Sequence, residues 1–267
     1  MINFKKILYP VDLSAQSSAV APSVAAMAKR FGSEVVLLHV ASASAPEPAL
    51  ETFAAGEFMD VRVVRELLQG DPAHQIVSYA AAHKVDLIMM PTHGHGPFRA
   101  LLLGSVTAKV LHDTHCPVWT GVHAEELTAH SPDRWKRMLC AVDTNEHGES
   151  LLKWASDFAL QQSLQLQLVH AVAGADGMWT EQSDPSMYGF LFHAARERLV
   201  KLQASVGTNF EIRLIGGSVG SAVHQAALDY SADLIVIGRG AIQTSLGRLK
   251  NSAYSIIRAA PCPVISV

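Results

Sequence analysis

A glycine-containing loop is the feature of this sequence that most suggests ligand chemistry. Residues 90–107 read MPTHGHGPFRALLLGSVT, in which nine residues separate Gly94 from Gly104 and Ser105 follows directly. Glycines in such a loop let main-chain N–H groups face a phosphate. The first turn of a following helix adds free N–H groups and partial positive charge. The pattern predicts an anion site, but an ordinary loop with Ser105 as a helix cap fits the same residues.

The elements that must position this loop occur twice in the chain. Four equivalent pairs carry the repeat: Asp12 and Asp143, His39 and His170, Asp86 and Asp233, and Cys116 and Cys262. An internal repeat of this length predicts two units of the same fold. We expect domains at residues 1–122 and 136–267, joined by a polar, proline-containing linker at 123–135.

Each copy alternates short apolar runs with segments of helical spacing, a pattern typical of a parallel α/β sheet with right-handed crossovers. The expected strands are residues 6–11, 34–40, 61–68, 85–90 and 117–120, then 137–142, 164–172, 209–215, 233–238 and 263–267. The expected helices are residues 19–31, 72–83, 105–112, 149–160, 185–206, 220–230 and 252–259. The fold class is therefore α/β, with two tandem doubly wound domains.

The two copies differ in length between their second and third strands. The repeat offset rises there from 131 to about 147, so the second copy holds roughly 16 more residues. They include the amphipathic segment 185–206, with Leu191, Ala195 and Leu199 on one face. The first copy has only residues 41–60, with room for a short helix over 48–55. We expect one face of its sheet to be thinly covered.

With these elements in place, the chain resembles the universal stress protein family over both halves. Members share a fold of five parallel strands, and many bind ATP through Gly-x2-Gly-x9-Gly-Ser/Thr. Gly94, Gly104 and Ser105 match the last three elements, whereas Pro91 replaces the first glycine. The resemblance implies strand order 3-2-1-4-5 in each domain. It also implies a pseudo-dimer of the two halves through their last strands, with further homodimerisation open.

The resemblance implies an adenine-nucleotide site in the first copy, with ATP, with or without Mg²⁺, as the ligand. The implied binding residues are Pro10, Val11, Asp12, Val40, Met90, Pro91, Gly94, Gly104, Ser105, Val106 and Thr107. Residues 10–12 match the family's adenine-side loop, and Val40 its hydrophobic adenine contact. Pro91 weakens the site because proline has no N–H to offer.

The second copy has lost most of the loop pattern. Lys250 and Asn251 stand where the first copy has Gly104 and Ser105, and Gly247 lies three residues too early. A lysine side chain there would occupy the phosphate approach. We expect this half to be degenerate and to serve as a structural partner.

Catalytic and metal-binding residues are not predicted. Asp12 and Asp143 follow strands and start helices, so helix capping is the simpler role for them. The loop histidines His93 and His95 are best explained as solvated residues. No lysine follows the loop as in a phosphate-binding Walker motif, so hydrolysis of ATP is expected to be slow at most.

Composition narrows the class of protein. The net charge of −3 gives no basic field for nucleic acid, and no apolar run is long enough for a membrane span. Three dispersed cysteines indicate reduced thiols in a cytoplasmic protein. The leading hypothesis is a stress-response regulator that binds an adenine nucleotide and acts on an unidentified protein partner. The alternatives are a module that acts through protein contacts alone and a weak ATP hydrolase.

Overall fold

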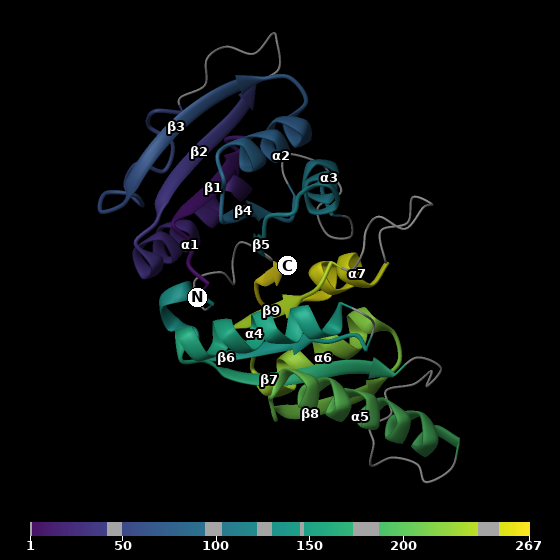
Figure 1. Cartoon of the computed structure of the whole chain (residues 1–267). Coiled ribbons are helices and arrows are strands. Elements are labelled where there is room, and N and C mark those ends of the chain that lie inside the picture. Colours follow the sequence, from purple (N-terminus) through teal and green to yellow (C-terminus); the bar gives the residue numbers. More distant parts are fainter. Residues whose placement is uncertain are drawn as a thin grey trace. The chain divides into compact units, whose positions relative to one another are not determined.

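The computed structural model describes residues 2–41, 50–93, 103–121, 130–144, 147–172, 187–239 and 251–267. The chain divides into two compact α/β units (Figure 1). The first unit is Asn3–Arg134 together with Ile265–Val267, and the second is Trp135–Val264 together with Ile2.

The first unit is a parallel sheet in the order β3-β2-β1-β4-β5, as predicted. Its strands are β1 (Lys6–Val11), β2 (Glu34–Ala41), β3 (Arg62–Gln69), β4 (Leu87–Pro91) and β5 (Val118–Gly121). Its helices are α1 (Ala15–Phe31), α2 (Pro72–Ala82) and α3 (Ser105–Asp113). Helices α2 and α3 pack together. The order reverses between β1 and β4, which makes that point the switch of the sheet.

The second unit repeats the order as β8-β7-β6-β9-β10. Its strands are β6 (Arg137–Ala141), β7 (Gln165–Val172), β8 (Glu211–Gly216), β9 (Leu234–Ile237) and β10 (Val264–Ser266). Its helices are α4 (Gly148–Gln162), α5 (Met187–Val206), α6 (Val219–Tyr230) and α7 (Asn251–Ala259). Helices α4 and α5 pack together on one face of the sheet, and α6 and α7 pack together on the other (Figure 1).

The repeated aspartates Asp86 and Asp233 anchor the central strand of each unit. A side-chain oxygen of Asp86 accepts a hydrogen bond of 2.8 Å from the amide of Lys6. In the second unit Asp233 accepts one of 2.9 Å from the amide of Arg137. These bonds satisfy main-chain donors where β1 and β6 begin, which explains why the aspartate recurs.

In the described part of the segment between β2 and β3, the first unit has turns, which pack beside α1 on one face of the sheet. Residues 50–60 form turns, so the described part of the helix suggested at 48–55 is absent. Phe58 from this segment is buried, and its ring centroid lies 6.3 Å from that of Tyr9. The cover stays thin at the sheet edge, where Leu67 of β3 is 43% exposed.

The described end of the segment predicted as a linker packs against the first unit. Pro132–Arg134 form a 3₁₀ turn, and Arg30 of α1 donates to the carbonyl oxygen of Pro132. Trp135 is buried. The end of this segment is therefore part of the packed structure instead of a solvated connection.

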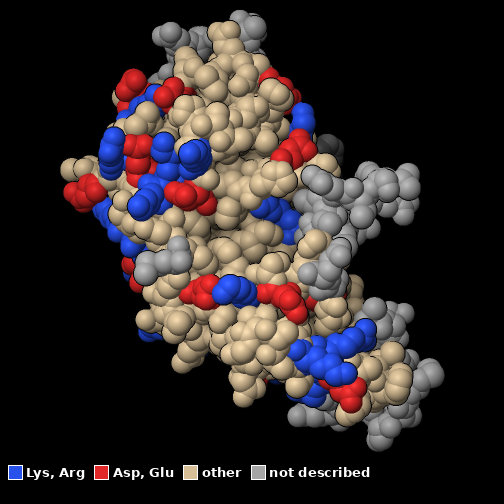
Figure 2. All heavy atoms as spheres, in the orientation of Figure 1, with Lys and Arg blue, Asp and Glu red and all other residues tan. Residues whose placement is uncertain are grey.

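The helices and the surface charge agree with the composition of the sequence. No described helix combines the length and apolar character that crossing a bilayer requires. On the face that Figure 2 shows, acidic and basic side chains are interspersed, in keeping with the small net charge.

Candidate functional site: two strand-end sites

The described residues of the predicted nucleotide site meet at the switch point of the first unit. Pro10 and Val11 end β1, Val40 is close to the end of β2, and Met90 and Pro91 end β4. Parallel strands carry their carboxyl ends to the same edge, where α/β sheets bind ligands. Gly94 and His95 lie outside the described residues.

Helix α3 begins at this edge, and no side chain of the described residues caps its first turn. Gly104 is the N-cap residue and makes no side-chain cap, while its N–H donates to the carbonyl oxygen of Thr92 at 2.9 Å. Ser105 is exposed and Val106 is half-buried. An uncapped first turn presents main-chain N–H groups and partial positive charge to an anion.

The backbone leaves little room for a side chain at Gly104. Its φ of −58° suits any residue. A Cβ at this position would lie 3.3 Å from the Cα of His93 and 3.3 Å from the carbonyl oxygen of Thr92. The close approach of backbone to backbone explains the glycine that opens α3.

A hydrogen bond of Thr107 connects the start of α3 to the end of β4. Its hydroxyl donates to the carbonyl oxygen of Pro91 at 3.1 Å, and the side chain is buried. Thr107 therefore positions the start of α3, and its predicted place in the nucleotide site stays a prediction. His93, which sequence analysis placed in solvent, is half-buried and bonds the hydroxyl of Thr92 through Nδ1 at 2.6 Å.

Asp12 supports the start of α1 without capping it. Ser14 is the N-cap residue, and its hydroxyl accepts from the amide of Ser17 at 3.1 Å. Asp12 accepts from the hydroxyl of Ser17 at 2.6 Å and from the amide of Ser14 at 3.0 Å. The predicted capping role thus belongs to Ser14, with Asp12 as its partner.

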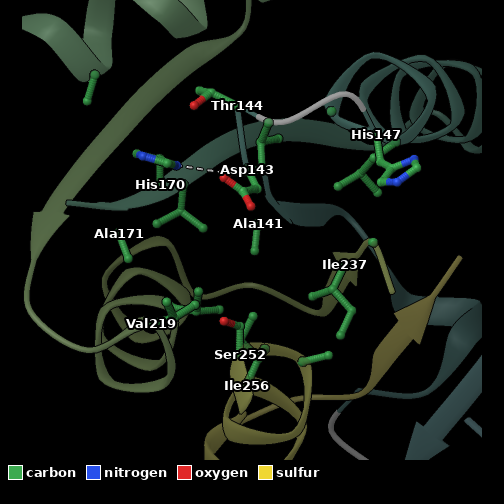
Figure 3. Close-up of a pocket in the computed structure, with 18 of the residues that line it drawn as sticks. Ala141, Asp143, Thr144, His147, His170, Ala171, Val219, Ile237, Ser252 and Ile256 are labelled. Carbon is green, nitrogen blue, oxygen red and sulfur yellow. Dashed lines mark hydrogen bonds between the residues drawn. The ribbon is translucent and has the colours of Figure 1, made fainter. Parts of the chain in front are cut away.

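The second unit contains a well-formed pocket that sequence analysis did not predict. It has a volume of about 410 Å³ and lies at the ends of β6, β7 and β9, at the switch between β6 and β9 (Figure 3). Helices α4, α5, α6 and α7 complete its wall. The volume falls in the range of about 300–1,000 Å³ that is usual for small-molecule sites.

Pocket residues divide into an apolar floor and a polar rim. We define the floor as the buried lining side chains Val142, Leu151, Val169, Val172, Ala195, Val223, Ile237, Ala253 and Ile256. We define the rim as the polar lining side chains Asp143, Thr144, His147, His170, Arg198, Arg239 and Ser252. Asp143, Thr144 and His147 come from the segment between β6 and α4, whereas Ser252 comes from α7 (Figure 3).

Gly148 lets α4 start against the chain that leaves β6. A Cβ at Gly148 would lie 2.4 Å from the carbonyl oxygen of Asp143. The first copy has Ser17 at the equivalent position, where its hydroxyl bonds Asp12. The two sites therefore differ in how the aspartate after the central strand is held.

The signal for this pocket was present in the extra residues of the second copy. They form α5, from which Leu191, Ala195 and Arg198 line the pocket. The sequence places Leu191 and Ala195 on one apolar face of a helix, and such a stripe does not distinguish a core from a cavity wall. Among the described residues, no cluster of three His, Cys, Asp or Glu side chains is placed to hold a metal ion.

Comparison with known proteins decides the family. Residues 3–60, 50–120 and 134–267 match the Universal stress protein family. The chain belongs to this family. A universal stress protein from Methanocaldococcus jannaschii is 32% identical over 136 residues, covering 43% of this chain and 80% of the relative.

The tandem fold of this universal stress protein is also found in a solved structure. One from Archaeoglobus fulgidus aligns with all of this chain and 97% of its own, with a TM-score of 0.69 and 22% identity. A family protein from Arabidopsis thaliana, 19% identical, was solved with AMP bound. It covers 43% of this chain and 90% of its own length, with a TM-score of 0.34.

Proposed function

We propose that this universal stress protein binds ATP in its first unit and acts as a nucleotide-dependent regulator in the cytoplasm. The ligand would lie at the ends of β1, β2 and β4, with its phosphates at the start of α3. The observation that carries the proposal is the uncapped first turn of α3 behind Gly104, at the switch point of a parallel sheet.

The adenine ring would lie against the strand ends. Val11 and Met90 are buried there and Val40 is half-buried, so they offer apolar surface beside main-chain polar groups. The phosphates would meet the main-chain N–H groups of Ser105 and Val106 and the hydroxyl of Ser105. Mg²⁺, where present, would bind through the phosphates, because it usually keeps several waters and few protein ligands.

Binding without rapid hydrolysis fits the same residues. A general base must reach the proton that it removes. Asp12, the carboxylate nearest in sequence to the strand end, already accepts from Ser14 and Ser17. We therefore propose that the nucleotide acts as a signal to a protein partner instead of as a substrate.

Titration calorimetry with ATP and Mg²⁺ on Gly104→Lys tests the site. This variant imitates the second copy, and its long side chain would occupy the phosphate approach. We expect affinity to fall at least a hundredfold. The contacts of 3.3 Å at this position require shifts of only a few tenths of an ångström, so the unit should stay folded.

Gly56→Lys is the matched control. Gly56 is exposed in the turn segment 50–60, and a Cβ there meets nothing within 4 Å. It should bind ATP as the unchanged protein does. Equal affinity of Gly104→Lys and Gly56→Lys, with both variants folded by circular dichroism, would show that the nucleotide site lies elsewhere.

A further inference from the structure

The pocket of the second unit has no part in the proposed function. In sequence, Lys250 and Asn251 stand where a phosphate-binding helix start has glycine and serine. The pocket is nevertheless formed at the same sheet edge, and helix α5 supplies part of its wall, whereas the described residues 50–60 of the first copy form turns. The residues that line this pocket therefore determine which ligand it can bind.

The floor is apolar and buried. Val169 and Ile237 come from the sheet, and Leu151, Val223 and Ile256 come from three different helices. Each of these side chains is at most 6% exposed. An apolar cavity favours an apolar ligand body, because filling it removes hydrocarbon surface from water.

The rim carries a small positive charge. Arg198 on α5 and Arg239 after β9 line the pocket, with Asp143 after β6 as the acidic group. With neutral histidines, these rim side chains sum to one positive charge. Nε of Arg198 donates to the carbonyl oxygen of Ala194 at 3.1 Å, which leaves the two terminal nitrogens of the guanidinium for a planar anion.

We propose that this pocket binds an amphipathic organic anion, with an alkyl chain on the floor and a single carboxylate at Arg198. One carboxylate matches the charge of the rim. A triphosphate would bring several negative charges to a rim that also holds Asp143. The ligand class is that of medium-chain carboxylic acids.

Titration of the full-length protein with octanoate, decanoate and dodecanoate tests the floor. Each added methylene that enters the pocket should raise affinity roughly fourfold, which corresponds to about 0.8 kcal/mol for a buried CH₂. Decanol should bind more weakly than decanoate because it lacks the charge. Affinity that does not change with chain length would overturn the proposal, as would no binding by any of the three acids.

Two charge reversals on α5 test the rim. Arg198→Glu should weaken decanoate binding at least tenfold. Lys201→Glu makes the same change on the same helix, at an exposed residue that does not line the pocket, and should leave affinity within twofold. Both positions are exposed, so both variants should fold. Equal losses of affinity in the two variants would mean that decanoate responds only to the net charge of α5. Arg198 would then not bind the carboxylate, and the proposal would be overturned.

Competition separates this ligand from a nucleotide. ATP at saturation should leave decanoate affinity unchanged, because the two sites lie in different units. Stoichiometric displacement of decanoate by ATP would assign the pocket to nucleotide and overturn the proposal. That result is distinct from a failure of the first-unit site, which Gly104→Lys measures separately.

Discussion

Nδ1 of His170 lies 2.8 Å from the carbonyl oxygen of Val142, and His39 makes the same contact to Val11 in the first unit. In each unit the ring joins the end of the second strand to the residue before the repeated aspartate. A neutral ring with its proton on Nδ1 donates this bond. The histidine thus fixes the backbone from which each strand-end site is built, which is why it recurs.

Replacing His170 by leucine should destabilise the second unit. The carbonyl oxygen of Val142 would lose its side-chain donor, and a typical hydrogen bond contributes about 0.5–1.5 kcal/mol. Urea unfolding measures the change. His193→Leu is the control, since that side chain is 74% exposed on α5 and should change stability by less than about 0.5 kcal/mol. Equal stability of the two variants would mean that the His170 bond contributes nothing.

Gly148→Ala should cost more than an ordinary surface change. The new methyl group would lie 2.4 Å from the carbonyl oxygen of Asp143, a backbone atom that cannot turn away. Overpacking of this kind costs about 1–3 kcal/mol, measured as a lower melting temperature. Gly56→Ala, with open space around it, should show no such loss. An unchanged melting temperature in Gly148→Ala would contradict the close approach of α4 to Asp143.

Pro91→Gly should strengthen ATP binding in the first unit. The change restores the first glycine of the family motif and adds an N–H at the end of β4. One additional hydrogen bond of about 0.5–1.5 kcal/mol corresponds to roughly two- to twelvefold in affinity. Pro72→Gly, at the start of α2, removes the same ring outside the proposed site and should leave ATP affinity unchanged. No gain in Pro91→Gly would show that this position does not touch the ligand.

The three thiols should react very unequally. Burial raises the pKa of Cys140 and of Cys262, so their thiolates form only in strongly alkaline solution. Cys116 is half-buried. Ellman's reagent at about pH 8 should label one thiol per folded chain and three after denaturation, and Cys116→Ser should abolish the fast reaction. Rapid labelling of two or more thiols in the folded protein would contradict the burial of the other two.

Much of the fold was predictable because its signals are local. Apolar runs such as that of β1 are buried on both sides in a parallel sheet, and Gly32 ends α1 with a φ of 64°. The resemblance to universal stress proteins then implied the strand order of both sheets. The helix suggested at 48–55 was wrong over its described part, because turn residues there bury Phe58 without helical spacing.

The sites were less predictable because they depend on contacts distant in sequence. The motif pointed to Gly104. The close approach of its backbone to Thr92 and His93 is evident only in the structure. Thr107 matched the motif, but its hydrogen bond to Pro91 could not be predicted from the local sequence. In the pocket of the second unit, Arg198 lies near strand ends that are distant in sequence. No local sequence pattern distinguishes the residues of the pocket wall from core residues.

The most direct test of the central claim is the number of ATP molecules bound per chain at saturation, measured by equilibrium dialysis with labelled ATP and Mg²⁺. The account predicts one per chain in the unchanged protein and none in Gly104→Lys. No binding to the unchanged protein, or two per chain with one or more surviving in Gly104→Lys, would contradict a nucleotide site confined to the first unit.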